Sequence, residues 1–235
     1  CDTFEGLKIL DFEFCTSAPQ TFLMKTEHQE HLRKVKTLNL SRNSLHELPD
    51  KALVSLSQLR LIDLSRNQLA KLDRGVFSGQ AGLRYLDLSY NRLEALDLSL
   101  TWTHKLQVLD ISHNRLKYID VGSGFFNKLR LLDLSHNNIR TYDVGNTIRS
   151  QFRKLEKLDL SHNEISGTVI RSEVDVYRLN LTVDLSSNNI SRLDMRMTPR
   201  DVMVAKKAFY SGSYTTPYIL HGNPIIGDCY AGLLN

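Results

Sequence analysis

Apolar residues recur along the chain in one nine-residue pattern, Leu-x-x-Leu-x-Leu-x-x-Asn. The pattern occurs eight times with asparagine in the ninth position, and a further copy near the start has cysteine there. These ninth positions are Cys15, Asn43, Asn67, Asn91, Asn114, Asn137, Asn163, Asn188 and Asn223. Because most copies lie about 24 residues apart, the chain is predicted to form a solenoid with one copy in each coil.

The fourth and sixth positions of each copy are predicted to face the core, because side chains alternate across a β-strand. The copy with Leu59, Ile62 and Leu64 illustrates this alternation. A single strand cannot bury its leucines alone, whereas stacked copies place their fourth positions in one apolar column. That column contains Leu38, Ile62, Leu86, Leu109, Leu132, Leu158 and Val183.

The ninth-position residues are predicted to be structural. An asparagine amide at the turn that follows each strand can satisfy buried backbone groups of adjacent coils. Cys15 stands in this ladder position, where a buried free thiol would be tolerated. Alternatively, Cys15 forms a disulfide with Cys1, and the residues leave both interpretations open.

The repeat length and pattern are typical of leucine-rich repeats. They predict an α/β solenoid, a horseshoe with a parallel β-sheet on its concave face and irregular or short helical returns on its convex side. Apolar residues of the returns, such as Leu69, Leu72 and Phe77, are expected to close the second wall of the core.

The C-terminal part resembles extracellular leucine-rich-repeat proteins, whose cysteine-rich cap usually begins Gly-Asn-Pro-x-x-Cys-Asp-Cys. Gly222, Asn223, Pro224 and Cys229 fit this pattern, whereas Gly227 stands where its first cysteine is expected. An aberrant penultimate repeat, an insertion and this cap, all within residues 180–229, are similar to the end of the ectodomain in insect Toll receptors. The resemblance implies a receptor that binds a dimeric cystine-knot cytokine of the Spätzle type, with receptor dimerisation, and signals through a cytoplasmic domain.

Two regions are expected on this basis. Residues 1–214 would form the repeat array of about eight repeats, with an irregular insertion at 192–214. Residues 215–235 would hold the last repeat strand and the start of a truncated cysteine-rich cap.

Three triplets match the N-glycosylation sequon, at Asn39, Asn180 and Asn189. They favour an extracellular module, either the ectodomain of a cell-surface membrane protein or a secreted protein. No stretch approaches the roughly 18 apolar residues of a membrane span, so membrane attachment would require a segment outside this sequence.

The third, fifth and seventh positions are predicted to point to the concave side. The fifth position gives a column of carboxylates and the seventh a column of serines, which are either a common repeat solution or a cation-binding face. The carboxylates are Asp11, Asp63, Asp87, Asp110, Asp133, Asp159 and Asp184, and the serines are Ser65, Ser89, Ser112, Ser135, Ser161 and Ser186. Basic residues at the second position, Lys8, Lys36, Arg60, Arg84 and Arg130, are expected to help neutralise the carboxylates.

Ligand contacts are predicted in two places. The concave positions with larger side chains are Leu61, Tyr85, Leu131 and Lys157. The insertion supplies Arg196, Arg200, Lys206 and Lys207, although it is alternatively a solvated spacer that covers the open end of the core.

Histidines recur at the eighth position, as His113, His136 and His162, and would either sense pH or fill an exposed flank copied by duplication. Because they lie on different coils, we do not expect a metal site, and no motif predicts a cofactor.

The chain is not expected to be an enzyme, because its Ser, His and Asp residues occupy repeated positions instead of one unique constellation. Nucleic-acid binding is not expected, because the basic residues behind the net charge of +4 are scattered among acids. We therefore predict a non-catalytic binding module of a Toll-like innate immune or developmental receptor. The alternative is a secreted adaptor or matrix scaffold.

Overall fold

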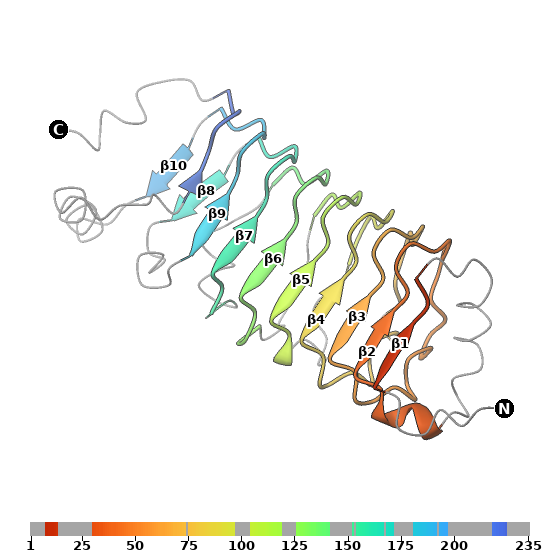
Figure 1. Ribbon diagram of the computed structural model, residues 1–235. Coiled ribbons are helices and arrows are strands. Elements are labelled where there is room, and N and C mark those ends of the chain that lie inside the picture. The colour runs from red at the N-terminus through yellow and green to blue at the C-terminus, as the bar shows by residue number, and fades with distance from the viewer. Residues whose placement is uncertain are drawn as a thin grey trace.

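The sheet of the solenoid contains nine parallel strands, in the computed structural model shown in Figure 1. The structure describes residues 8–13, 30–73, 75–96, 104–118, 126–141, 152, 154–166, 168–171, 181–191, 193–196 and 218–224. The strands of the sheet, in spatial order, are β1 (Ile9–Asp11), β2 (Thr37–Asn39), β3 (Leu61–Asp63), β4 (Tyr85–Asp87), β5 (Val108–Asp110), β6 (Leu131–Asp133), β7 (Lys157–Asp159), β9 (Thr182–Asp184) and β11 (Tyr218–Ile219). Each coil of the chain therefore contributes one strand, as the repeat predicts.

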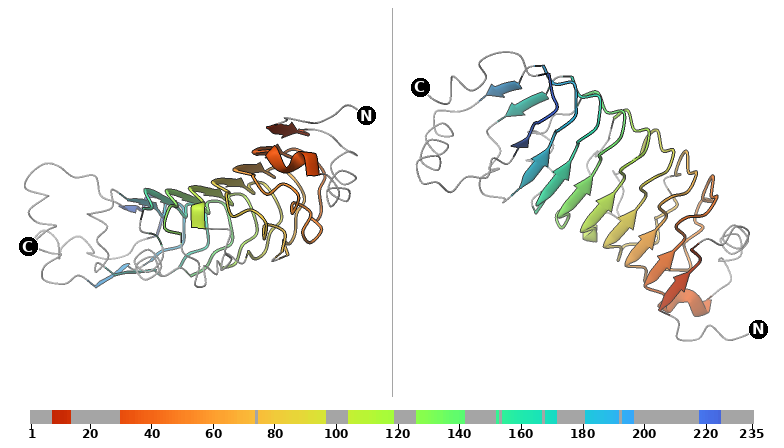
Figure 2. Two further views of the ribbon diagram at one scale, coloured as in Figure 1. Left: turned by 90° about the horizontal axis from the view of Figure 1, so that it is seen from below. Right: turned by 45° about the horizontal axis from the view of Figure 1, so that its top comes forward.

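The returning segments form the opposite face of the solenoid (Figure 2). They include a short 3-10 helix, η2 (Glu30–Lys34), and two strands, β8 (Thr168–Arg171) and β10 (Leu193–Arg196), which pair in parallel. Part of the predicted irregular insertion is therefore a strand that pairs with the return of an earlier coil. No helix in the described residues is long and apolar enough to cross a membrane.

One continuous core lies between the sheet and the returns. The middle residue of each sheet strand from β1 to β9 is buried, and the flanking positions are more exposed in all of these strands except β7. Leu69 and Phe77 of the returns are buried as expected, and Leu72 is partly buried against them. The predicted α/β solenoid with a parallel sheet on one face is confirmed.

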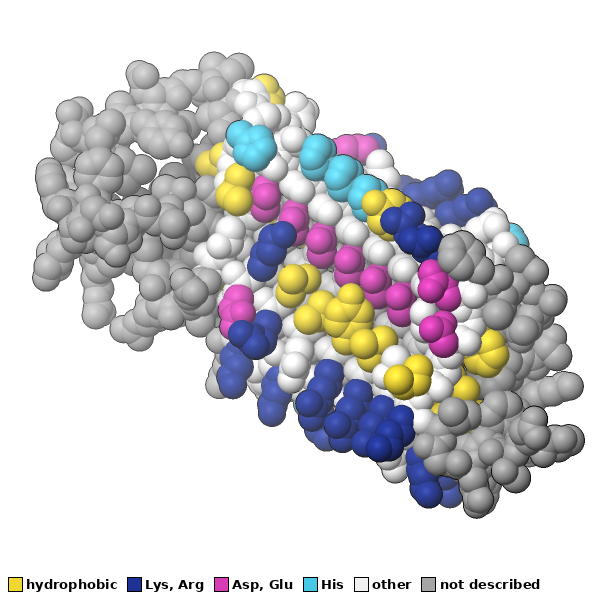
Figure 3. All heavy atoms as spheres, in the orientation of Figure 1, with side chains coloured by type: hydrophobic (Ala, Val, Ile, Leu, Met, Phe, Trp, Pro, Cys, Tyr) yellow, Lys and Arg dark blue, Asp and Glu magenta, His cyan; other side chains and the backbone are white. Residues whose placement is uncertain are grey.

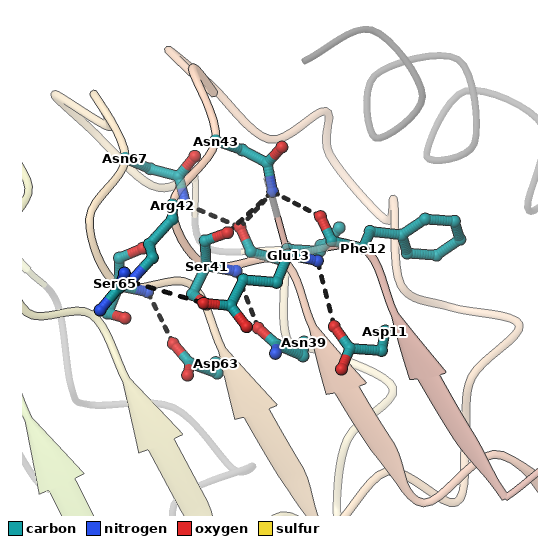
Figure 4. Close-up of polar contacts among 11 residues, drawn as sticks. Asp11, Phe12, Glu13, Asn39, Ser41, Arg42, Asn43, Asp63, Ser65 and Asn67 are labelled. Carbon is teal, nitrogen blue, oxygen red and sulfur yellow. Dashed lines mark hydrogen bonds and ion pairs between the residues drawn. The ribbon is translucent and has the colours of Figure 1, made fainter. Parts of the chain in front are cut away.

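A ladder of asparagine amides joins consecutive coils where the chain leaves the sheet. In the fourth described copy, Nδ2 of Asn114 donates to the carbonyl oxygen of Ile111 at 3.1 Å and to that of Leu88, in the preceding coil, at 2.9 Å. Its Oδ1 accepts the backbone N–H of Leu93 at 2.9 Å. The first rungs, at Asn43 and Asn67, are drawn in Figure 4. Each amide therefore satisfies buried backbone groups of two coils, which water cannot reach.

The same pattern of bonds repeats along the sheet. Amide donors reach the preceding coil from Asn43, Asn67, Asn91, Asn114, Asn137, Asn163, Asn188 and Asn223. Cys15, the predicted first member, lies outside the described residues, as do Cys1 and Cys229.

Asn137 and Asn138 provide a matched test of this ladder. Asn137 is 6% exposed and its amide bonds both its own coil and the preceding one. Asn138 is exposed, and its side chain donates to Glu164 Oε1 at 2.8 Å. We expect Asn137→Ala to lower the free energy of unfolding by about 3 kcal/mol, because it leaves buried backbone groups unpaired.

Asn138→Ala should cost no more than about 0.5 kcal/mol, because it loses only an exposed contact. Urea unfolding followed by circular dichroism measures both. Similar losses in the two variants would show that the amide ladder does not stabilise the coil.

Candidate binding face

Three bands of side chains run along the face of the sheet, across its strands (Figure 3). We define the basic band as residues preceding four strands, Lys36, Arg60, Arg84 and Arg130. The apolar band is the first residue of strands β3–β6, Leu61, Tyr85, Val108 and Leu131. The acidic band is the third strand residue, Asp63, Asp87, Asp110, Asp133, Asp159 and Asp184.

The strand register brings the members of each band together. Leu61 pairs with Tyr85, Tyr85 with Val108, and Val108 with Leu131. Neighbouring strands of a sheet lie about 4.8 Å apart, so the apolar and acidic bands have one side chain in each step of that length, whereas Gln107 interrupts the basic band before β5. The predicted contacts Leu61, Tyr85 and Leu131 thus lie in one row, together with Val108, which was not among the predicted contacts.

The apolar band is limited at both ends. Thr37 of β2 precedes Leu61 in the same row, and Lys157 of β7, another predicted contact, follows Leu131. Lys157 Nζ lies 3.0 Å from Asp159 Oδ2, and this pairing raises the pKa of Lys157. The apolar surface therefore spans four consecutive coils.

The carboxylates of the acidic band hold the backbone at the end of each strand. Oδ1 of Asp110 accepts the N–H of Ser112 at 2.9 Å, and Asn39 does the same for Ser41 at 3.0 Å. Equivalent bonds are made by Asp63, Asp87, Asp133, Asp159 and Asp184. Because asparagine serves equally well in β2, the carboxylate column is explained by backbone hydrogen bonding. No group of three or more metal-ligating side chains occurs within the described residues.

The expectation that the serines lie on the exposed face is wrong. The six serines are 4–8% exposed, because the chain turns inward after the third strand residue. In one copy, the Ser112 N–H donates to Asp110 and the Ser112 carbonyl oxygen accepts from Asn114 at 3.1 Å. The serines are consequently not part of the exposed sheet face.

The prediction that the basic residues help neutralise the carboxylates of the acidic band is wrong for the described residues. Arg130 Nε instead binds Glu156 Oε1 at 2.8 Å, and the apolar band lies between the two charged bands. Within the described residues, Lys157 provides the ion pair to the acidic band. The two charged bands therefore remain separate, and among the described residues Arg60, Arg84, Asp87 and Asp110 make no ion pair.

Two central carboxylates, those of Asp87 and Asp110, are costly to ionise. The pKa of Asp110 is raised to about 6, chiefly by burial and in smaller part by the carboxylates of Asp87 and Asp133, against the opposing hydrogen bonds from Ser112. Burial also raises the pKa of Asp87. At Asp159, burial is outweighed by hydrogen bonds from Ser161 and Lys157, so its pKa is lowered. The centre of the acidic band thus lacks the cation that Asp159 has.

The eighth-position side chains form a continuous stack beside the acidic band (Figure 3). The ring centroids of Tyr90 and His113 are 4.0 Å apart, those of His113 and His136 4.1 Å, and those of His136 and His162 4.2 Å. The guanidinium of Arg66 lies 4.2 Å from the Tyr90 centroid and caps one end. Rings on different coils are therefore in direct contact.

The backbone imposes this stack. Residues at this position adopt a left-handed conformation, with φ of 54° at Tyr90, 52° at His113 and 54° at both His136 and His162. The N–H of each donates to the following coil, for example His113 to Ser135 at 3.0 Å. The repeat pattern identifies the three histidines, and their shared position on adjacent coils is the signal from which the stack could have been predicted.

The remaining predicted residues lie elsewhere. Arg196 ends strand β10, away from the nine-stranded sheet, and Arg200, Lys206 and Lys207 lie outside the described residues. Of the sequon asparagines, Asn189 is exposed, Asn39 is half-buried and Asn180 is outside the described residues. Among the described residues, the predicted contacts that lie together on the sheet face are therefore those on strands β3, β4, β6 and β7.

Asp110 allows a test of how much the ionised carboxylates of the acidic band lower the free energy of unfolding. Because its folded-state pKa is raised from the ordinary 3.8, the folded state loses stability as the pH rises from about 4 to beyond 6. We expect Asp110→Asn to keep the bond to Ser112 and to raise the free energy of unfolding at pH 7.5 by up to about 1 kcal/mol, after allowance for solvent screening.

The gain from Asp110→Asn should vanish below about pH 4, where the carboxyl is neutral in both states. Asp110→Ala, the control, loses the acceptor and should be destabilised by about 1 kcal/mol. Urea titrations at several pH values measure these differences. A gain that is the same at pH 3.5 and 7.5 would contradict the charge explanation.

The stack predicts coupled protonation. The pKa of His113 is lowered by burial and then by the neighbouring His136, against the opposing carboxylate of Asp133. His113 therefore supports the fold fully above about pH 6.5 and loses this contribution as the pH falls toward its lowered pKa. We expect His136→Asn to raise the pKa of His113, with asparagine chosen because it tolerates positive φ.

Titration of the His113 ring by NMR measures this shift. His46→Asn, which changes an exposed histidine outside the stack, serves as the control. An unchanged His113 pKa in the His136 variant would rule out coupling through the stack.

Comparison with known proteins supports the repeat architecture. The family model described as leucine rich repeat matches residues 31–99 and 104–165, more than half of the 235 residues. A search of curated protein sequences finds no significant match.

Three solved structures resemble this chain. A leucine-rich-repeat protein of Leptospira interrogans has a TM-score of 0.69 and 24% identity, with coverage of 97% of this chain and 58% of that one. Toll in the Drosophila Toll–Spätzle complex has a TM-score of 0.52 and 26% identity, with coverage of 69% and 26%. TLR13 in its complex with ssRNA13 has a TM-score of 0.59 and 23% identity, with coverage of 94% and 32%.

This chain corresponds to less than two thirds of the length of each of these three proteins. The Leptospira and TLR13 structures share the fold of this chain, at 24% and 23% identity, and the sequence identity to Toll is 26%. Since the repeat model matches more than half of the residues, the chain belongs to the leucine-rich-repeat family, with a fold like that of Toll-like receptor ectodomains.

Proposed function

We propose that the chain is a non-catalytic binding module of a Toll-like receptor of the insect Toll type, and that it recognises a protein ligand through the sheet face. The observation that carries this proposal is the apolar band between two separate bands of opposite charge. Leucine-rich-repeat solenoids are typically non-catalytic scaffolds for protein interactions, and their extended sheet surface suits a large partner.

The apolar band is suited to the centre of an interface. Tyr85, whose pKa is raised by burial and by the carboxylates of Asp87, Asp110 and Asp63, combines a large ring with a polar hydroxyl. Tyrosine is enriched among the residues that dominate interface energies, and charged residues usually form the rim. The bands reproduce that arrangement.

A cystine-knot cytokine of the Spätzle type is the ligand that we propose to test first. The support is the likeness to Toll in its complex with Spätzle, together with the C-terminal resemblance of the sequence. Receptor dimerisation by a dimeric ligand belongs to the same proposal, and so does the contribution of Arg196, Arg200, Lys206 and Lys207 as a second contact region.

An extracellular location at the cell surface is part of the proposal. The sequons at Asn180 and Asn189 support it, and Asn189 is exposed. The side chain of Asn39 already accepts the Ser41 N–H, which makes it a less suitable glycan site. A Cys1–Cys15 disulfide remains a proposal.

The first experiment is titration of a mature cystine-knot cytokine of the Spätzle type into the purified chain, or into a longer protein that contains it, with light scattering as the readout. We expect saturable binding with a defined stoichiometry. Tyr85→Ala should weaken this binding roughly 30-fold or more if the sheet face forms the centre of the interface.

Tyr118→Ala is the matched control, because Tyr118 is 59% exposed and lies outside the sheet. Equal affinity of the two variants would remove the sheet face from the binding site. Failure of a folded protein to bind any such cytokine would instead favour the secreted adaptor or matrix scaffold.

A further inference from the structure

We propose that the partner segment on strands β3–β6 is an amphipathic α-helix that runs across the strands, with carboxylates on one flank and cations on the other. This inference rests on the proposed function, because it specifies what the protein-binding sheet face recognises. A cytokine whose contact region consists only of β-strands would therefore bind elsewhere on the chain.

The length of the apolar band fits three turns of a helix. Its four side chains stand on consecutive strands, and Thr37 and Lys157 end the row. Three steps of about 4.8 Å give a length of about 14 Å. A helix advances about 5.4 Å in each turn, so three turns cover about 16 Å and place one apolar side chain near each strand.

An extended partner fits this row less well. In an extended partner, side chains on one face repeat about every 6.8 Å, whereas the strands that it would cross repeat about every 4.8 Å. The two spacings are therefore already out of step at the second strand crossed. A strand also has only two faces, whereas a helix presents parallel stripes along its length. The three bands are stripes of this kind.

The width of the bands also fits a helix. In one coil the basic, apolar and acidic bands are represented by Arg84, Tyr85 and Asp87. The basic and acidic positions are three residues apart along an extended chain, or about 10 Å. This separation matches the helix diameter of about 10–12 Å, so a helix over Tyr85 would have one flank over each charged band.

Both charged bands have unused capacity in the described part of the chain. No ion pair there involves Arg60 or Arg84. The carboxylates of Asp87 and Asp110 each accept a backbone bond through Oδ1 and have no cation partner among the described residues. Their raised pKa values agree with this lack of compensation.

The order of the bands determines the direction of the helix. Reversing a helix on the surface exchanges its two flanks, so a helix with separate acidic and basic flanks matches the bands in only one direction. A helix that mixes both charges on each flank matches in neither direction. This difference gives a composition-matched control.

The test uses two synthetic 14-residue peptides of identical composition, both stapled to be helical in solution. Each carries one apolar stripe; the segregated peptide has Glu on one flank and Lys on the other, and the mixed peptide has both on each flank. Fluorescence anisotropy with the 235-residue chain should show that the segregated peptide binds at least about tenfold more tightly, with an advantage that declines as salt is added.

Charge reversal in the chain provides the second arm. Arg60→Glu with Arg84→Glu should weaken the segregated peptide at least about tenfold and create a preference for a peptide with Lys on both flanks. Arg92→Glu with Arg115→Glu is the matched control, because both residues are exposed and lie on the returns. Circular dichroism checks that both variants fold.

Equal binding of the two peptides, or no binding of either, would overturn the helix proposal. If a cytokine binds and Tyr85→Ala abolishes that binding while neither peptide binds, the proposed function stands and the helix proposal fails. If the segregated peptide binds as expected and no cytokine does, the helix proposal stands and the cytokine assignment fails.

Discussion

The asparagine side-chain amide at the end of each strand is the interaction on which this structure depends. A solenoid that turns sharply at every coil leaves backbone N–H and C=O groups buried at the turn. Asn137 shows the solution, because one amide bonds carbonyl groups of its own and the preceding coil and also accepts the N–H of Leu116. No other side chain supplies two donors and a carbonyl acceptor at this length, so the amide sets the register of each coil on the last.

The functional surface follows from that register. Once the coils are aligned, equal repeat positions form rows, and a side chain at one position meets its counterpart about 4.8 Å away. This alignment joins Leu61, Tyr85, Val108 and Leu131 into an apolar row, and it also crowds like charges together. Burial is the main cause of the raised pKa of Asp110 and of the lowered pKa of His113, and the aligned neighbours Asp87, Asp133 and His136 add to these shifts.

The wrong predictions have a common physical origin, because they extended the strand alternation beyond the strand. Strands β1–β7 and β9 of the nine-stranded sheet are each only three residues long, so the serines at position seven lie beyond the strand and are buried. The basic residues at position two precede the strand, and Arg130 consequently turns toward Glu156 instead of the aspartates. Strand β10, within the predicted irregular insertion, depends on pairing with β8, which no local pattern indicates.

The solenoid, the parallel sheet and the buried columns follow from the repeat pattern, because they depend on a regular spacing and on side-chain alternation. The same pattern also identifies Leu61, Tyr85 and Leu131 as larger residues on an otherwise small and acidic face. The stack of Arg66, Tyr90 and the three histidines, and the separation of two charged bands by an apolar row, become visible in the folded chain alone. These properties depend on contacts between coils and on the left-handed backbone turn at each coil. The repeat pattern alone gives neither the contacts nor the turn conformation.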